Sequence, residues 1–383
     1  MARSIFKISA LAFLASASVI SAAQAGGFSR GSADTDIIYE EGNFNLRAGA
    51  TIVSPTRKLT KALAPLGGSL IGTDYTDTYV IPSAAVKINL TDDLRCAATL
   101  SQPYGGSTSY AVPFGTSAKV SEKFAITETG VNCGYKFDLS KGQVWLLGGV
   151  YLESFNYDLS AVGGAINVNL KSTQPGFRIG AAYAIPEIAL RAELMYRAAS
   201  THDAVGTTTR VAPTGTPLDG LPIGVAVPVA SGNGNLPQSV EMKLQSGIAP
   251  GWLAFGSVKW TDWSVTETLD LTLAPGFNRQ NLYFWRDGWT VTGGIGHAFT
   301  EKLSGAVSLT WDRGVGTGFD LSSTTYTVGS GISYKDDLGG EMRFGGGVTY
   351  IAGASEDKYP AFLNTSVSSG WAWAVGASYK TKW

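Results

Sequence analysis

Charged residues are scarce in this chain. Lys, Arg, Asp and Glu together make up 15% of its 383 residues, whereas a soluble globular domain has about 25%. The formal net charge is −1, which argues against nucleic acid as a partner because no excess of cations is available for phosphates. A wall that faces lipid on one side fits this composition, and a secreted all-β domain of the same size stays open as the alternative.

A long apolar run is also missing. The run from Ile8 to Ile20 covers about 13 residues, and a membrane-spanning helix needs about 20. Two cations precede this run and Ala23-Gln24-Ala25 follows it, which is the layout of a secretory signal peptide with a small-residue cleavage site. We therefore expect residues 1–25 to be a signal peptide, the mature chain to begin at Gly26, and no transmembrane helix.

Residues with catalytic or metal-binding chemistry are few. The chain has two His and two Cys. His202 lies in a long polar segment and His297 on an apolar strand face, and neither has a partner at catalytic or metal-ligand spacing. No Gly-x-Ser-x-Gly, phosphate-binding loop or Cys-x-x-Cys motif occurs, and the paired carboxylates are interpreted as solvated. The sequence predicts a protein that is not an enzyme and has no cofactor or metal.

Glycine and aromatic residues are abundant, and apolar residues recur with a period of two. The chain contains 48 Gly, 10 Trp, 16 Tyr and 16 Phe. From Trp371 to Tyr379 apolar residues occupy every odd position, and the sequence ends in the aromatic residue Trp383. Alternation predicts a strand with one apolar face, and a last strand of this kind is typical of outer-membrane barrels.

The same alternation recurs along most of the chain, interrupted by six short turns and seven longer polar or glycine-rich segments. Outer-membrane barrels have short periplasmic turns and long extracellular loops. We therefore predict an all-β fold, a transmembrane antiparallel β-barrel of about 14 strands over residues 44–383. Residues 26–43 are too polar to span and are expected to form an N-terminal plug (hatch) in the lumen. The expected loops are 54–76, 105–122, 153–171, 199–236, 265–284, 312–325 and 353–366.

Seven Trp residues fall where the expected strands meet the expected loops. Aromatic rings prefer the interface between hydrocarbon and water. We expect these residues to be interfacial anchors: Trp252, Trp260, Trp263, Trp285, Trp289, Trp311 and Trp371.

Four short motifs occur in an order that is similar to a known family. They are Gln102-Pro103-Tyr104-Gly105-Gly106, Leu236-Pro237-Gln238-Ser239-Val240, Lys259-Trp260-Thr261-Asp262-Trp263-Ser264 and Trp285-Arg286-Asp287-Gly288-Trp289-Thr290-Val291. In this order the sequence resembles the FadL-type outer-membrane transporters of long-chain fatty acids and other hydrophobic compounds. One departure is that Ile37-Ile38-Tyr39 is followed by Glu40-Glu41-Gly42 rather than by an Asn-Pro-Ala-Gly-like element, so a shared opening trigger of the plug is in doubt.

Apolar residues in the long segments and cations on the inward faces are candidates for binding a fatty acid. Such a ligand needs an apolar groove and a few cations rather than a water-filled channel. The candidate groove residues are Phe155, Tyr157, Leu159, Leu218, Leu221, Ile223, Val225 and Val227. The candidates for the carboxylate are Arg178, Arg191, Arg197, Lys243, Lys259, Arg286 and Arg343. The alternative is that these cations pair with lumenal Glu residues.

Pro103, Gly105 and Gly106 interrupt a strand that would otherwise be continuous. Proline lacks the N–H that a ladder needs, so a bulge or an opening in the wall is expected here. In the family that the sequence resembles, such a break offers lateral exit for the substrate into the membrane. The alternative is an ordinary strand end.

The two cysteines are expected to form a disulfide. By parity Cys96 and Cys133 both point to the lipid side of strands joined by one extracellular segment. Adjacent antiparallel positions bring Cβ atoms to about 4.5–5.5 Å, near the distance a disulfide needs, and the periplasm is oxidising. The alternative is two thiols in neighbouring strands.

The sequence therefore predicts a monomeric barrel in the outer membrane of a Gram-negative bacterium. It would be folded by the barrel-assembly machinery, surrounded by outer-membrane lipid, and would take up long-chain fatty acids or similar hydrophobic molecules passively. A general porin for small polar solutes and a surface adhesin are the alternatives. A porin is expected to have a charged constriction loop, and the long segments here are poor in Asp and Glu.

Overall fold

The computed structural model of the protein describes residues 26–383. The expected signal peptide lies outside this range. In the range 26–383 no helix is long and apolar enough to cross a bilayer; the helices there are the short 3-10 turns η2 (Thr35–Tyr39), η3 (Pro186–Ile188), η4 (Pro217–Gly220) and η5 (Trp263–Val265).

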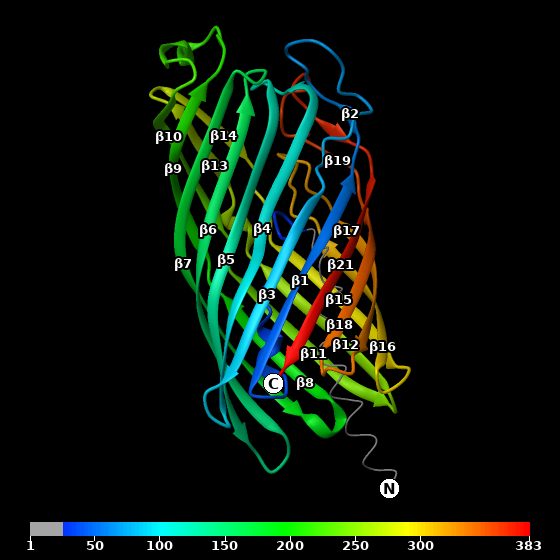
Figure 1. The fold of residues 1–383 in the computed structure, drawn as a ribbon. Helices are drawn as coiled ribbons and strands as arrows, with labels where there is room; N and C mark the ends of the chain where they lie inside the picture. The colour runs from blue at the N-terminus through cyan, green and yellow to red at the C-terminus, as the bar shows by residue number, and fades with distance from the viewer. Residues whose placement is uncertain (1–25) are drawn as a thin grey trace.

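The chain forms a closed antiparallel barrel of 14 strands, as the sequence predicted (Figure 1). Closure is made by the first and last strands, which pair from Asn45 with Lys382 to Thr56 with Trp371. The barrel strands are β1 (Phe44–Thr56), β3 (Tyr79–Asn89), β4 (Leu94–Phe114), β5 (Lys119–Asp138), β6 (Gln143–Ala161), β7 (Ile166–Ile185), β8 (Leu190–Arg197), β11 (Ser239–Ala249), β12 (Trp252–Thr261), β15 (Gly288–Ala298), β16 (Leu303–Arg313), β17 (Thr325–Lys335), β18 (Glu341–Ile351) and β21 (Gly370–Lys382).

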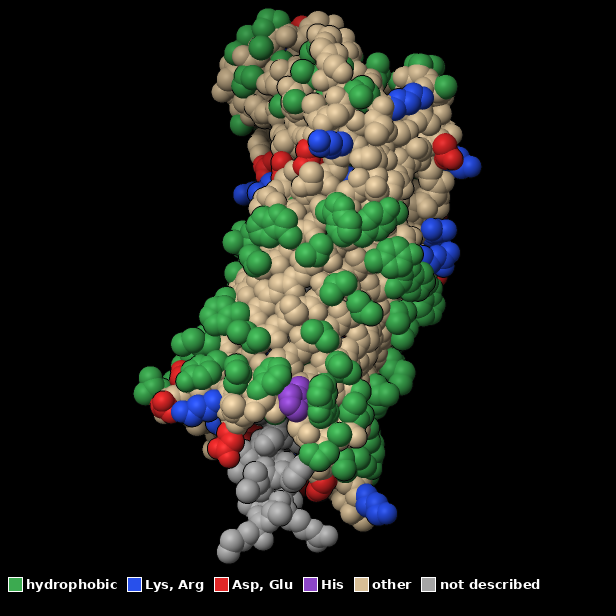
Figure 2. Space-filling model, turned by 90° about the vertical axis from the view of Figure 1, so that its right-hand side faces the viewer, with side chains coloured by type: hydrophobic (Ala, Val, Ile, Leu, Met, Phe, Trp, Pro, Cys, Tyr) green, Lys and Arg blue, Asp and Glu red, His purple; other side chains and the backbone are tan. Residues whose placement is uncertain are grey.

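Alternation along each strand sends apolar side chains outward and polar ones into the lumen. On β8, Leu194 is exposed on the outside whereas Arg191 and Glu193 are buried inside. Figure 2 shows hydrophobic side chains covering the middle of the barrel, with charged side chains mostly near its two ends. The outer surface is therefore suited to hydrocarbon in the middle and to water at each end.

Several expected loops are strands instead. The segments 105–122 and 153–171 are the upper halves of β4, β5, β6 and β7, which extend well above the rest of the barrel (Figure 1). Their sheet continues through β9 (Ser200–Arg210), β10 (Ala226–Leu236), β13 (Thr268–Ala274) and β14 (Phe277–Leu282). These hairpins bury one face and expose the other to water, so their low average hydropathy resembles that of a loop.

The tall sheet has a core of its own, distinct from the lumen of the barrel. Tyr157, Ile166, Leu170, Leu218 and Leu271 are all buried in one cluster there. On the opposite side of the mouth, the short strands β2 (Leu59–Lys61), β19 (Ala354–Ser355) and β20 (Ser366–Val367) form a small separate sheet. The extracellular end is thus packed structure rather than a set of free loops.

The N-terminal segment, residues 26–43, contacts inward-facing residues of many strands. Ile37 and Ile38 of η2 are buried against Trp145 and neighbouring apolar side chains of the wall. The segment also makes ion pairs, among them Glu40 with Arg47 at 2.6 Å and Asp34 with Arg47 at 2.7 Å. Both apolar and ionic contacts therefore hold this segment to the inside of the barrel.

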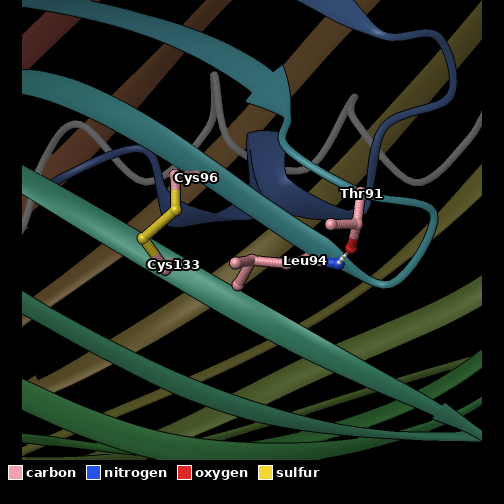
Figure 3. Close-up of a disulfide and its surroundings, with 4 residues drawn as sticks. All are labelled: Thr91, Leu94, Cys96 and Cys133. Atoms are coloured by element: carbon pink, nitrogen blue, oxygen red, sulfur yellow. Dashed lines mark hydrogen bonds between the residues drawn. A yellow bond between two sulfur atoms is a disulfide. The ribbon is translucent and has the colours of Figure 1, made fainter.

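Cys96 on β4 and Cys133 on β5 are joined by a disulfide (Figure 3). The two residues are direct cross-strand partners with Cα atoms 4.0 Å apart, which is the pairing expected from the parity argument. The bond lies close to the short turn between β3 and β4, where Leu94 N donates to Thr91 Oγ1 at 2.9 Å.

Candidate functional site

A cavity lined mainly by apolar and aromatic residues lies beneath the tall sheet, and we call it the aromatic cavity. Its volume is about 130 Å³. Residues of β4, β5, β6, β7, β9, β10 and β13 contribute to it, together with Phe28 of the N-terminal segment. The lining residues are Phe28, Gly106, Ser107, Thr108, Glu122, Phe124, Ile126, Phe155, Tyr157, Leu170, His202, Gly232, Gly234, Asn235, Leu236, Thr266, Thr268, Leu269 and Tyr283.

Phe28 is surrounded by aromatic rings. Its ring centroid lies 4.7 Å from that of Phe124, 4.7 Å from that of Trp285 and 6.1 Å from that of Trp263. Edge-to-face contacts of this kind are favourable for aromatic pairs. The N-terminal segment therefore supplies one wall of the aromatic cavity and is tied to it by stacking.

The expectation that all seven Trp residues are interfacial anchors is wrong for two of them. Trp263 and Trp285 are 1% and 4% exposed and belong to a cluster inside the barrel mouth. Trp263 lies in η5 and Trp285 lies just before β15, so neither is on a regular strand whose parity could be followed. Trp289 and Trp371, which do lie on regular strands, face outward.

Glu122 is the one side chain of Asp, Glu, Lys or Arg among the lining residues of the aromatic cavity. Its Oε1 accepts from Tyr157 Oη at 2.8 Å and from Asn281 Nδ2 at 3.3 Å. Its Oε2 pairs with Lys119 Nζ. Three donors, one of them an ammonium, hold this group as an ionised carboxylate.

A second cavity, of about 60 Å³, contains most of the expected cations, and we call it the charged cavity. Arg178, Arg197, Lys243 and Lys259 line it, and so do Glu128, Glu193 and Glu241. Ser29 also lines it. Since the preceding residue, Phe28, lines the aromatic cavity, the N-terminal segment runs between the two.

Most of the candidate cations are paired with carboxylates. Arg178 bonds Glu128, and Arg197 bonds both Glu128 and Glu153. Arg191 and Lys243 lie 3.1 and 3.7 Å from Asp36 of the N-terminal segment. Arg343 pairs with Glu341 at 2.7 Å and also approaches Glu40. These five cations thus satisfy carboxylates of the wall or of the N-terminal segment.

Two candidate cations are placed differently. Within residues 26–383, Lys259 has no carboxylate oxygen within 4.0 Å, although it lines the charged cavity. Arg286 was expected to face inward by parity and is exposed instead, with its Nε donating to Gly314 O at 3.1 Å. It precedes the first residue of β15, Gly288, so strand parity does not extend to it.

Asp36 of the N-terminal segment is held ionised by its surroundings. Burial alone would raise its pKa, but Lys243, Arg191 and Arg47 together lower the pKa of Asp36 to about 2. Ion pairing of this strength opposes release of the segment at neutral pH.

The expected apolar groove is only partly assembled. Phe155 and Tyr157 line the aromatic cavity. Leu159 and Leu218 are buried in the core of the tall sheet, and Leu221 packs against that core. Ile223 and Val225 are about half exposed at its tip, and Val227 on β10 is half-buried. The structure thus brings together two of the eight residues at the cavity.

The wall is interrupted between β3 and β4 at the place expected for a break. Their pairing runs from Asn89 with Arg95 to Ala84 with Leu100 and then stops. It resumes only at the isolated bridge between Thr76 and Thr108. On its other side β4 stays paired to β5, with one extra residue accommodated between Ser101 and Tyr104.

The N-terminal segment bonds to the interrupted part of β4. Arg30 N donates to Pro103 O at 2.8 Å, Gly31 N donates to Gln102 O at 2.9 Å, and Gly105 N donates to Phe28 O at 2.9 Å. The guanidinium of Arg30 lies 3.9 Å from the ring centroid of Tyr79 on β3. Residues 28–31 therefore contact both strands that border the interruption.

A third cavity, of about 200 Å³, reaches this interruption from the lumen. Ile81, Pro82 and Ser83 of β3 and Ser101 of β4 all line it. It shares Gly31 and Lys243 with the charged cavity. The three cavities thus follow one another from the tall sheet to the edge of the wall.

The histidines belong to hydrogen-bonded packing. His202 is on β9 rather than in a loop, and its Nδ1 lies 2.7 Å from Ser172 Oγ. His297 Nδ1 lies 3.0 Å from Gly251 O. In the described part of the chain no group of three His, Cys, Asp or Glu side chains could hold a metal ion.

Three residues at the site were not singled out from the sequence: Phe28, Arg30 and Glu122. Phe28 and Arg30 lie in residues 26–43, which were expected to form a plug without a role for either residue. Their roles depend on contacts with strands far along the chain. Glu122 lay in an expected loop. Glu122 shares its parity with Phe124 and Ile126, and this spacing of two was the available signal that the three side chains lie on one face of a strand.

Comparison with solved structures finds the same architecture. A FadL homologue from Pseudomonas aeruginosa superimposes with a TM-score of 0.73 at 12% identity, covering 91% of this chain and 92% of the other. The toluene transporter TodX of Pseudomonas putida superimposes with a TM-score of 0.63 at 13% identity, covering 96% of this chain and 97% of the other. The toluene transporter TbuX of Ralstonia pickettii superimposes with a TM-score of 0.60 at 14% identity, covering 97% of this chain and 99% of the other. No curated protein sequence matches the chain.

The sequence itself matches a family described as outer membrane protein transport protein (OMPP1/FadL/TodX) over residues 17–305. That family consists of transporters and not of enzymes. The match covers more than half of the chain and agrees with the barrel, the outer-membrane location and the resemblance seen in the sequence. The chain therefore belongs to the FadL/TodX family of outer-membrane transporters of hydrophobic compounds.

Proposed function

We propose that this protein takes up long-chain fatty acids or similar hydrophobic molecules passively across the outer membrane. The observation that carries the proposal is the aromatic cavity, which joins extracellular strands to the N-terminal segment and has a mainly apolar and aromatic lining. A hydrophobic molecule gains free energy by leaving water for such a cavity. Small aromatic compounds are a second candidate class, since two of the similar structures are those of toluene transporters.

In this proposal residues 26–43 act as a plug between capture and release. Phe28 lines the aromatic cavity and Ser29 lines the charged cavity, so a ligand that moves inward has to displace this part of the segment. The ion pairs of Asp34, Asp36 and Glu40 with the wall would keep the rest of the plug in place meanwhile. A small movement near Phe28 would suffice.

We further propose that the ligand leaves laterally between β3 and β4. The third cavity is lined by residues of both strands where their pairing is interrupted. An apolar molecule that leaves there enters the hydrocarbon layer without passing Arg343 and Lys380 at the periplasmic end of the lumen, although Arg47 and Lys243 line the third cavity itself. Leaving through the periplasmic end would cost the desolvation of several charges.

The barrel is proposed to work as a monomer that the barrel-assembly machinery inserts into outer-membrane lipid. Its 14 strands close on themselves, so the wall needs no second copy to pair with. The apolar outer face of strands such as β8 and β21 would meet lipid directly.

Two measurements on the same protein separate this function from a porin. Cells that lack their own hydrophobic transporters should accumulate labelled oleate or labelled toluene faster when they express this protein than with an empty vector. Liposomes containing the purified protein should not swell in sugars. Rapid swelling without uptake of either hydrophobic probe would favour a general porin, and neither swelling nor uptake would favour a surface adhesin.

A further inference from the structure

The aromatic cavity combines a wall of rings with one ionised carboxylate, and that combination restricts what it can bind. Phe28, Phe124, Phe155, Tyr157 and Tyr283 supply the rings. Glu122 is the charged member of the lining, and no Lys or Arg accompanies it there. The nearest cation, Lys119, is bonded to Glu122 and does not line the cavity.

We infer that this cavity selects uncharged single-ring aromatic molecules that carry a hydroxyl group, which donates to Glu122, and that it excludes aromatic carboxylates. The inference rests on the proposed uptake of hydrophobic molecules and narrows the ligand of this cavity to the second candidate class, small aromatic compounds, in place of long-chain fatty acids, which carry a carboxylate. In this inference Glu122 determines which ligands the cavity prefers.

The size of the cavity is the first argument. Its volume is about 130 Å³, and a protein cavity of about 150 Å³ is known to hold one benzene molecule. One ring with a small substituent therefore fits, whereas most of a long acyl chain would lie outside the cavity. The surrounding aromatic side chains favour stacked or edge-to-face contact with such a ring.

The hydrogen bonding of Glu122 is the second argument. A carboxylate offers about four acceptor positions, and the three donors Tyr157, Asn281 and Lys119 occupy two on Oε1 and one on Oε2. By this count one acceptor position of Glu122, which lines the cavity, remains for a donor from a ligand. The side chain of Glu122 is only 17% exposed, so water screens its charge poorly. A hydrogen bond to this ionised oxygen is therefore stronger than one to a neutral acceptor.

The sign of the charge is the third argument. A ligand carboxylate would place a second negative charge in a cavity whose lining contains no Lys or Arg, where repulsion between like charges is poorly screened. The cations of the charged cavity do not line the aromatic cavity, and Phe28 and Ser29 lie between the two. A phenol of the same size adds a donor and no charge.

Three ligands of nearly the same size test this inference on the purified wild-type protein in detergent: 4-methylphenol, toluene and 4-methylbenzoate. Isothermal titration should give 4-methylphenol the highest affinity, about tenfold above toluene, since a hydrogen bond to a charged group is worth roughly that factor. 4-Methylbenzoate should bind at least tenfold more weakly than toluene. The control is Gly234→Phe, whose ring is meant to fill the cavity; its Cβ would lie 3.3 Å from Leu269 Cδ1, so that side chain has to shift slightly. The heat measured with this variant reports partition of the ligand into micelles and is subtracted from the wild-type titration.

Two substitutions should move the preference in opposite directions. Glu122→Gln should cut the advantage of 4-methylphenol over toluene to within about threefold and raise the affinity for 4-methylbenzoate. Lys119→Gln removes the ammonium partner of the Glu122 carboxylate. The affinity of this variant for 4-methylbenzoate should be lower than that of the wild type. Folding of each variant is checked by heat-modifiable migration on gels.

The outcomes distinguish this inference from the proposed function. Equal affinity for 4-methylphenol and toluene, or tight binding of 4-methylbenzoate by the wild type, would overturn the inference while hydrophobic uptake stands. If none of the three ligands binds the wild type more tightly than it binds Gly234→Phe, the aromatic cavity is not a capture site and that part of the proposed function is overturned as well. The wild-type comparison alone decides the question if a variant does not fold.

Discussion

Phe28 is placed where a single side chain separates two environments. It lines the aromatic cavity, and its neighbour Ser29 lines the charged cavity. Its position depends on stacking with Phe124 and Trp285 and on the hydrogen bond from Gly105 N to its carbonyl. The backbone bond does not depend on the ring, so the side chain can be removed without freeing the segment.

Phe28→Ala should therefore connect the two cavities while the N-terminal segment stays in place. We expect higher ion conductance in planar bilayers, because loss of the ring leaves a path from the aromatic cavity to the lumen. Phe299→Ala, which removes an exposed ring near a periplasmic turn, is the matched control and should leave conductance unchanged. Conductance at the wild-type level in Phe28→Ala would show that the segment's backbone, not the ring, closes the path.

Asp36 gives a prediction about pH. Its pKa of about 2 in the folded protein is below the value of about 3.9 in an unfolded chain, so its ion pairs stabilise the folded state fully above pH ~4 and lose that effect as the pH falls from ~4 to ~2. Asp36→Asn should reduce the free energy of unfolding by on the order of 2 kcal/mol at pH 7.

That difference between Asp36→Asn and wild type should shrink as the pH is lowered below ~4. Urea unfolding followed by tryptophan fluorescence at pH 7, 4 and 2.5 measures it. Asp92→Asn, at an exposed turn residue, serves as the control with no expected change. A difference that stays constant down to pH 2.5 would mean that Asp36 acts through packing and not through its charge.

At the scale of elements, the closing strands depend on a short C-terminal contact. Phe44 and Trp383 exchange two backbone hydrogen bonds, of 3.2 and 2.9 Å, and their rings lie 5.2 Å apart. Deleting Trp383 removes both bonds and the ring contact. At about 1 kcal/mol for each, the barrel should lose about 3 kcal/mol and a smaller fraction should reach the folded, heat-modifiable form on gels. An unchanged folded fraction would contradict this role.

The elements also show how far the sequence alone could be followed. Alternation identified β8 and β21 because regular strands place Leu194 and Trp373 outward at every second position. It failed at 105–122 and 153–171, where amphipathic hairpins stand in water and resemble loops. It also failed at Trp285 and Arg286, which precede β15, so that Trp285 is buried and Arg286 exposed.

The candidate site was less predictable than the wall. Cys96 and Cys133 could be paired because they share the outward parity of two consecutive expected strands, and the register of β4 and β5 places them opposite each other. The aromatic cavity joins Phe28 with residues as distant in sequence as Tyr283, and no local pattern reports such contacts. The break at Pro103 was visible, but its occupation by residues 28–31 was not, since those hydrogen bonds come from a separate segment.

For the whole molecule, the proposed function makes the three cavities and the interrupted ladder one route from the extracellular sheet to the hydrocarbon layer. In this proposal the aromatic cavity captures the ligand, the N-terminal segment lies in its path, and the third cavity leads to the edge between β3 and β4. Filling the break with strand-forming residues would be a poor test, because a Cβ at Gly105 would lie 2.7 Å from the guanidinium of Arg30 and would displace the segment as well.

Tethering the two strands across the interruption tests lateral exit most directly. Ile81→Cys and Pro103→Cys would face each other if the register of Ala84 and Leu100 continued, and the native cysteines are already bonded to each other. A short bismaleimide applied to cells that express this double variant should link the strands and reduce uptake of a labelled hydrophobic probe sharply. The control pair, Ala84→Cys with Leu100→Cys, lies on the intact ladder and should transport equally before and after treatment. Unchanged uptake by the linked Ile81 and Pro103 variant would contradict lateral exit between β3 and β4.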